Sequence, residues 1–316
     1  MKYQEFTCAI EKEVRQKLNK DIRVTLHSVM KNNSRERIGL VIKEPDVMAA
    51  PTIYLEEFYE KYQKEKVFKT LEAIACDILN YYRSVRCEIS QDFNKLGDFK
   101  NVRDRILYKL INTEKNGELL KSIPHRKIVD LSIAYYVLLE MNELGTGTIL
   151  IDHEQIQRWG VGEAQLFELA NANSHNLLPV QLMTIKSVVK ELTEPLEEVQ
   201  ENLLRRFCSN APGDTADWTS DNDERADIMY VLTNRNRSLG AACILYPQVL
   251  DQIRLYLKEN YYILPSSIHE VIIVPESKCL EKSEMDKIIT EINAAHVADE
   301  EVLSDHSYYY NPSGLW

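Results

Sequence analysis

The chain has 316 residues, 44% of them hydrophobic and 28% charged, which are the proportions of an ordinary globular protein. This composition excludes a disordered chain and predicts a packed core, with enough length for two domains. The formal net charge of −11 comes from Asp and Glu spread along the chain, without a Lys- or Arg-rich block, so a nucleic-acid partner is not expected.

Six cysteines lie far apart in the sequence, without a C-x-x-C pair or the spacing of a zinc site. They are Cys8, Cys76, Cys87, Cys208, Cys243 and Cys279. This spacing predicts reduced thiols without a zinc site. The sequence has no intact cofactor motif, so no cofactor is expected. The N-terminus lacks the apolar region of a signal peptide, and no apolar run reaches the length of a membrane span. We therefore expect a cytoplasmic protein without a membrane partner.

The N-terminal part predicts helices packed on a β-hairpin. Phe6, Ile10, Val14 and Leu18 recur every four residues, which indicates a helix with one apolar stripe. Apolar and polar residues alternate at 22–27, and an apolar run follows at 38–42. These two patterns predict two strands, joined by turn residues at 31–34. Helical spacing returns at 55–62 and 71–82.

The middle of the chain predicts strands at 106–111, 128–139 and 148–151, followed by helices at 153–159, 163–172 and 195–207. Asp152 is well placed to cap the first of these helices, and Pro195 to open the last. Residues 209–226 are polar and acidic without periodicity, as in a linker or long loop. The predicted domains are therefore an N-terminal region at 1–208 and a C-terminal region at 227–316.

The C-terminal region predicts strands at 228–232, 241–245, 262–264 and 271–274, with helices at 249–257 and 284–293. Ser283 is a suitable N-cap for the last helix, with Met285, Ile288, Ile289 and Ile292 as its buried stripe. Cys243 is predicted to be a buried, inert thiol. The fold class predicted is α+β, with a mixed sheet and helices in the N-terminal part and a small α/β layer in the C-terminal part.

The loop 265–270 between two of these strands gathers the polar residues most suited to a site, in the sequence PSSIHE. Ser267, His269 and Glu270 are the residue types of a nucleophile, a base and an orienting acid. Alternation in an extended chain places Ser267 and His269 on one face and Glu270 on the other, and no G-x-S-x-G motif surrounds either serine. Catalysis, ligand binding and a structural role for the loop remain open.

Other polar patterns are weaker. His153-Glu154 and His269-Glu270 begin like the zinc motif H-E-x-x-H, but neither has the second histidine. A site assembled from His125, Asp130, Asp152 and His153 stays open. Residues 145–147, Gly-Thr-Gly, are interpreted as a hairpin turn, and residues 308–310 are three tyrosines suited to a sheet edge or a partner surface.

Several stretches resemble an uncharacterised bacterial family of unknown function, found mostly in anaerobic gut bacteria. In the first half they are KNN at 31–33, PTIYLEEFY at 51–59, INTEKN at 111–116, PH at 124–125 and DLSIAY at 130–135. In the second half they are residues 230–234, 240–247, 264–275 and 303–311. The resemblance implies one family unit across nearly the whole chain and brings no catalytic residue with it.

These observations favour a binding or regulatory protein with an unknown protein or small-molecule ligand. One alternative is a hydrolase that uses the 264–270 loop, completed by Asp305 or Asn234; another is a structural subunit of an assembly, contacted through the tyrosines. The candidate ligand-contact residues are Ser266, Ser267, His269, Glu270, Asn234, Asp305, His125 and Asp130.

Overall fold

The structure is a computed structural model that describes residues 1–45, 52–64, 70–93, 98–142, 145–188, 216–218, 229–279 and 281–315. The chain forms two compact units. Unit 1 comprises Met1–Arg103 with Leu139–Gly147, and unit 2 comprises Asp104–Leu138 with Thr148–Trp316. The fold class is α+β, as the sequence predicts.

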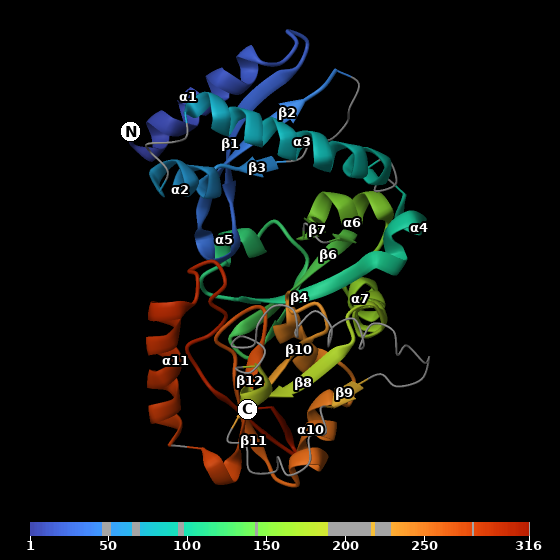
Figure 1. The fold of residues 1–316 in the computed structure, drawn as a ribbon. Coiled ribbons are helices and arrows are strands. Elements are labelled where there is room, and N and C mark those ends of the chain that lie inside the picture. Colours follow the sequence, from blue (N-terminus) through green and yellow to red (C-terminus); the bar gives the residue numbers. More distant parts are fainter. Residues whose placement is uncertain are drawn as a thin grey trace. The chain divides into compact units, whose positions relative to one another are not determined.

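Unit 1 is a three-stranded antiparallel sheet with helices on one face (Figure 1). In chain order its elements are α1 (Tyr3–Gln16), β1 (Arg23–Met30), η1 (Asn32–Ser34), β2 (Glu36–Lys43), β3 (Thr52–Tyr54), α2 (Glu56–Lys64), α3 (Leu71–Phe93) and α4 (Phe99–Val102). The helix and hairpin predicted from the sequence are present, and Asn33 in the turn takes the left-handed backbone that asparagine tolerates.

The core of unit 1 is built from apolar residues that recur at helical spacing in the helices and at every second position in the strands. Phe6, Ile10 and Val14 on α1 are buried against alternate strand residues such as Leu40 and Ile42 and against Ile78 of α3. Because strand side chains alternate between faces, this core occupies one face of the sheet only.

Unit 2 contains a seven-stranded mixed sheet in the order β14-β13-β11-β12-β10-β8-β9. The strands are β8 (Val180–Thr184), β9 (Ala216–Trp218), β10 (Tyr230–Asn234), β11 (Tyr261–Leu264), β12 (Val271–Pro275), β13 (Tyr308–Asn311) and β14 (Gly314–Leu315). Only β8 and β9 pair in parallel among the described strands.

Two helices cover opposite faces of this sheet, which confirms the predicted α/β layer. Helix α11 (Lys282–His296) packs on Leu264 and Val274. Tyr261 lies three positions before Leu264 on the same strand and therefore points to the opposite face, where its hydroxyl donates to a backbone oxygen of α10 (Val249–Leu257). The sheet takes strands from both sides of the predicted linker, since β8 pairs with β10. The linker itself, 209–226, lies outside the described residues apart from β9, and the helix predicted at 195–207 lies outside them entirely.

A second sheet of unit 2 pairs β4 (Ile106–Asn112), β5 (His125–Ile128) and β7 (Gly145–Leu150) with the long strand β6 (Leu131–Asn142), whose far end belongs to unit 1. Short helices α5 (Gly117–Leu120) and α6 (His153–Trp159) and the longer α7 (Glu163–Leu177) follow the strands. Asp152 caps α6 as predicted, accepting a hydrogen bond from the Gln155 amide. The predicted turn glycines at 145–147 lie within β7.

Three local predictions for the C-terminal region are wrong. Residues 241–245 form the 3-10 helix η4 (Gly240–Leu245), because a short run buried on every side has no period that separates strand from helix. Helix α11 begins two residues earlier than predicted, with Glu281 as N-cap in place of Ser283. Of its predicted buried stripe, Met285 and Ile289 are buried, but Ile288 and Ile292 are 38% and 41% exposed.

Candidate functional site

The predicted loop lies where three chain segments of unit 2 meet: residues 234–240, 265–270 and 301–306. We name this region the loop junction. Backbone hydrogen bonds join the second and third segments, from Ile268 N to Glu301 O (2.9 Å), from Leu303 N to Ser266 O (3.0 Å) and from Ser304 N to Pro265 O (2.9 Å). A rigid strand end therefore supports the polar residues.

Asn234 and Gly240 shape the first segment. The fully buried Asn234 side chain accepts hydrogen bonds from the Asn236 and Ser238 amides and donates to the Ser238 carbonyl, which folds the loop back on itself. Gly240 then comes so close to the second segment that a Cβ atom would lie 2.5 Å from the His269 carbonyl oxygen and 2.7 Å from the Asn234 amide nitrogen. Only glycine fits this approach.

Ser267 and His269 are both engaged with the main chain. Ser267 Oγ accepts a hydrogen bond from the His269 amide (3.0 Å), and the serine is 5% exposed. His269 Nδ1 lies 3.2 Å from the Leu239 amide, whose N–H can only donate. The ring proton of the neutral imidazole therefore sits on Nε2, which lies 3.4 Å from Glu301 Oε1.

Glu270 borders the same histidine and is half-buried. Burial raises the pKa of its carboxyl group, the nearby Glu301 raises it further, and His269 and Arg237 act in the opposite direction. Glu301 was not predicted as a site residue; only the pairing of residues 265–268 with 301–304, which has no sequence signal, brings it here.

Asp130 and Asp305 lie beside the third segment. Asp130 accepts hydrogen bonds from Ser304 Oγ (2.7 Å) and from the Tyr308 hydroxyl. Asp305 Oδ1 accepts from Asn293 Nδ2 (2.7 Å), and its other oxygen lies 3.8 Å from Lys115 Nζ. These contacts hold the buried Ser304 between β13 and helix α11.

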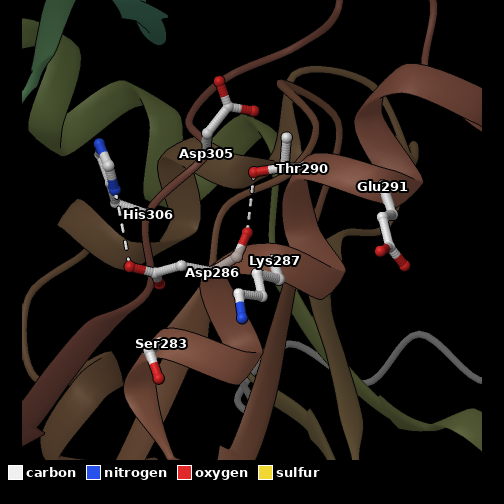
Figure 2. Close-up of a pocket in the computed structure, with 7 residues that line it drawn as sticks. All are labelled: Ser283, Asp286, Lys287, Thr290, Glu291, Asp305 and His306. Atoms are coloured by element: carbon white, nitrogen blue, oxygen red, sulfur yellow. Dashed lines mark hydrogen bonds and ion pairs between the residues drawn. The ribbon is translucent and has the colours of Figure 1, made fainter.

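The surface next to this segment is an open depression of about 350 Å³ on helix α11 (Figure 2). It is lined by Ser283, Asp286, Lys287, Thr290, Glu291, Asp305 and His306. Figure 2 shows Asp286 joined to His306 and to Thr290. His306 Nδ1 lies 3.6 Å from the Asp286 carboxylate, and the Thr290 hydroxyl donates to the backbone oxygen of Asp286. Partial burial raises the pKa of Asp286, but hydrogen bonds from Ser307 and the nearby Lys282 outweigh this and keep the pKa below its usual value.

His125 stands apart from the other predicted residues. It is exposed on the edge strand β5, and its ring nitrogen lies 3.1 Å from the Ile123 carbonyl oxygen. Asp152 is engaged in capping α6. Within the described parts of the chain, no three His, Cys, Asp or Glu side chains are grouped so as to hold a metal ion.

The remaining chemical candidates have structural environments. Cys243 is fully buried, as predicted, and burial raises the pKa of its thiol to about 12. Tyr308 and Tyr310 are buried on one face of β13, while Tyr309 contacts Tyr262 and Glu276 on the other. The described helices include none that is long and apolar enough to cross a membrane.

The fold and this region define an α+β protein with a rigid polar loop junction beside an acidic depression. The chain belongs to the DUF5688 family, a family of unknown function whose model matches residues 3–312. Neither the curated proteins nor the solved structures contain a significant match.

Proposed function

We propose that this protein binds a positively charged partner at the depression on α11, and that the loop junction supports this surface without performing hydrolysis. The observation that carries the proposal is the acidic lining of the depression, whereas the hydrogen bonding of His269 argues against the catalytic alternative. With Nδ1 accepting from Leu239 and the ring proton on Nε2, neither nitrogen offers a lone pair to a serine hydroxyl. A binding role for the polar cluster is therefore better supported than a catalytic one.

The hydrolase alternative also lacks a nucleophile in position. Ser267 is buried and its oxygen faces the backbone amide of His269. Ser266 uses its carbonyl to pair with Leu303 and is only half-exposed. A general base has to reach the proton that it abstracts, and neither serine makes a hydrogen bond with the imidazole in the described structure.

The charge of the surface favours a cationic partner. Unit 2 contains 31 Asp and Glu against 19 Lys and Arg. The depression is lined by three carboxylates, those of Asp286, Glu291 and Asp305, against Lys287 and His306, while Lys115 lies 3.8 Å from Asp305 outside this lining. Complementary charge speeds association and selects against anionic partners, and an open depression suits the side chain of a basic protein segment better than an enclosed small molecule.

The structural-subunit alternative is less well supported, because the three tyrosines belong to an internal strand. Strand β13 pairs with β11 on one side and with β14 on the other. The family resemblance and the scattered cysteines support a bacterial, cytoplasmic setting as part of the same proposal.

The binding proposal is tested with a fluorescein-labelled oligolysine peptide in a polarisation titration of the full chain. The double variant Glu291→Gln/Asp305→Asn removes two charges from the depression and should weaken binding about tenfold. The control Glu154→Gln/Glu168→Gln removes the same charge from exposed positions on α6 and α7 and should bind as the original protein does. Equal loss in both variants, or no binding of the peptide, contradicts the proposal.

A fluorophosphonate probe tests the alternative reaction directly. We expect no labelling of the folded protein, because neither Ser266 nor Ser267 is hydrogen-bonded to a base in the part of the chain that the structure describes. Labelling that disappears in Ser267→Ala or Ser266→Ala, with the fold intact by circular dichroism, would instead establish the hydrolase.

A further inference from the structure

The sheet of unit 1 has a second face, opposite the helices. Its outward positions are Arg23, Thr25, His27 and Val29 on β1, Arg37, Gly39, Val41 and Lys43 on β2, and Thr52 and Tyr54 on β3. Thr25 Oγ1 and His27 Nε2 lie 2.9 Å apart, as expected for neighbours on one side of a strand. The residues between them, such as Val24 and Leu40, point into the core.

This face carries positive charge at both ends. Arg23 and Lys43 are paired across β1 and β2 and are exposed. At the other end, Lys31 Nζ lies 3.9 Å and Arg37 Cζ 5.9 Å from the centre of the Tyr54 ring. Lys43 lies six positions after Arg37, a span of about 20 Å along a strand.

Negative charge is concentrated on the other side of the unit. None of the outward positions of β1, β2 and β3 is acidic, whereas α1, α2 and α3 contain 10 Asp and Glu against 6 Lys and Arg. Unit 1 is nearly neutral, with 19 basic and 18 acidic residues. In unit 1 the positive charges therefore lie on the sheet face and the excess of negative charges lies on the helices. The net charge of −11 for the whole chain conceals this separation.

The centre of the face combines small and polar residues with two valines. A Cβ atom on Gly39 would lie 2.1 Å from Thr52 Cγ2, so the threonine methyl already occupies the space above the glycine. Val29 and Val41 are the two aliphatic residues among the outward positions given above. Stable protein interfaces need a buried apolar core, whereas nucleic-acid interfaces are more polar and more positively charged.

We infer that the outward face of this sheet binds single-stranded nucleic acid. The cations at the two ends contact backbone phosphates, and the hydroxyl, imidazole and phenol groups between them face the nucleotides. An open sheet presents a platform to an unpaired strand, and the outward positions supply no helix to enter a duplex groove.

Fluorescence polarisation of the full chain with labelled 20-nucleotide poly-U RNA and oligo-dT tests the inference. The variant Arg23→Gln/Lys43→Gln should weaken binding on the order of 20-fold at 0.1 M salt and flatten the slope of log K against log salt by about 1.4, since two phosphate contacts are lost. The control Lys12→Gln/Arg83→Gln removes one lysine and one arginine from exposed positions on α1 and α3. It should leave both the affinity and the slope unchanged.

Thermal unfolding establishes that both variants remain folded. The inference is overturned if neither oligonucleotide binds at 10 µM protein, a concentration about that of non-specific nucleic-acid complexes. Equal weakening by the two variants overturns it as well, because binding then follows net charge. Tighter binding of polyglutamate or of phosphatidylserine vesicles than of RNA would replace nucleic acid by an acidic protein or a lipid surface. None of these outcomes affects the proposed site on unit 2, whose variants and probe are different.

Discussion

Glu270 is a carboxylate held where its charge is unfavourable. Its folded-state pKa lies above the unfolded value, chiefly through burial, so the folded protein retains the proton to higher pH than the unfolded chain does. The stability associated with the protonated form is present at low pH and is lost as the pH rises through the folded-state pKa.

Glu270→Gln should therefore raise the free energy of unfolding at pH 7, by less than about 1 kcal/mol because the side chain is partly solvated. This increase in the free energy of unfolding should be smaller at pH 4, where the native glutamate is itself protonated. Urea unfolding at both pH values measures it, and Glu168→Gln, on an exposed position, provides the comparison. A gain that is equal at pH 4 and pH 7 would show that the charge of Glu270 is not its cause.

At the scale of elements, the close approach of Gly240 fixes the loop 234–240 against the strand end at His269. The atoms that a Cβ would meet are a carbonyl oxygen and an amide nitrogen of the main chain, together with Thr233 Oγ1 at 2.2 Å. Main-chain atoms cannot move aside as the end of a flexible side chain can. Gly240→Ala should destabilise the protein by about 2–3 kcal/mol.

Gly117→Ala is the matched control, because no atom lies within 4 Å of the position of its Cβ. Alanine is also the better helix former at this first residue of α5, so the change should stay within about 0.5 kcal/mol. The difference in urea midpoint between the two variants measures the effect. Similar midpoints would mean that residues 234–240 can move away from His269 without a loss of stability.

The same elements show what the sequence could predict. The spacing of apolar residues and the turn residues identified the N-terminal helix, the hairpin and the strands β11 and β12, so the loop between these two strands was predicted correctly. The contacts that define its chemistry are long-range in sequence. Glu301 comes close to His269 only through the pairing of residues 265–268 with 301–304, and Ser304 donates a hydrogen bond to Asp130, 174 positions away. No local sequence pattern encodes either contact.

At the scale of the whole molecule, each unit has a core of its own. The cluster around Phe6, Leu40 and Ile78 lies entirely in unit 1, while the clusters around Tyr136, Ile111 and Val274 lie entirely in unit 2. Two independent cores predict two unfolding transitions, since a chain of this length does not have to unfold in one step.

The distribution of tryptophan makes this testable without altering the protein. Trp159, Trp218 and Trp316 all belong to unit 2, so tryptophan fluorescence reports on that unit alone, whereas far-UV circular dichroism reports the helices of both. In a urea titration we expect the two signals to give different midpoints, with the dichroism curve showing a second step that the fluorescence lacks. Superimposable curves with a single slope would mean that the two cores unfold cooperatively. The fragment 1–103, which has no tryptophan and contains the entire unit 1 cluster, should reproduce the additional step alone, because every side chain of that core is retained.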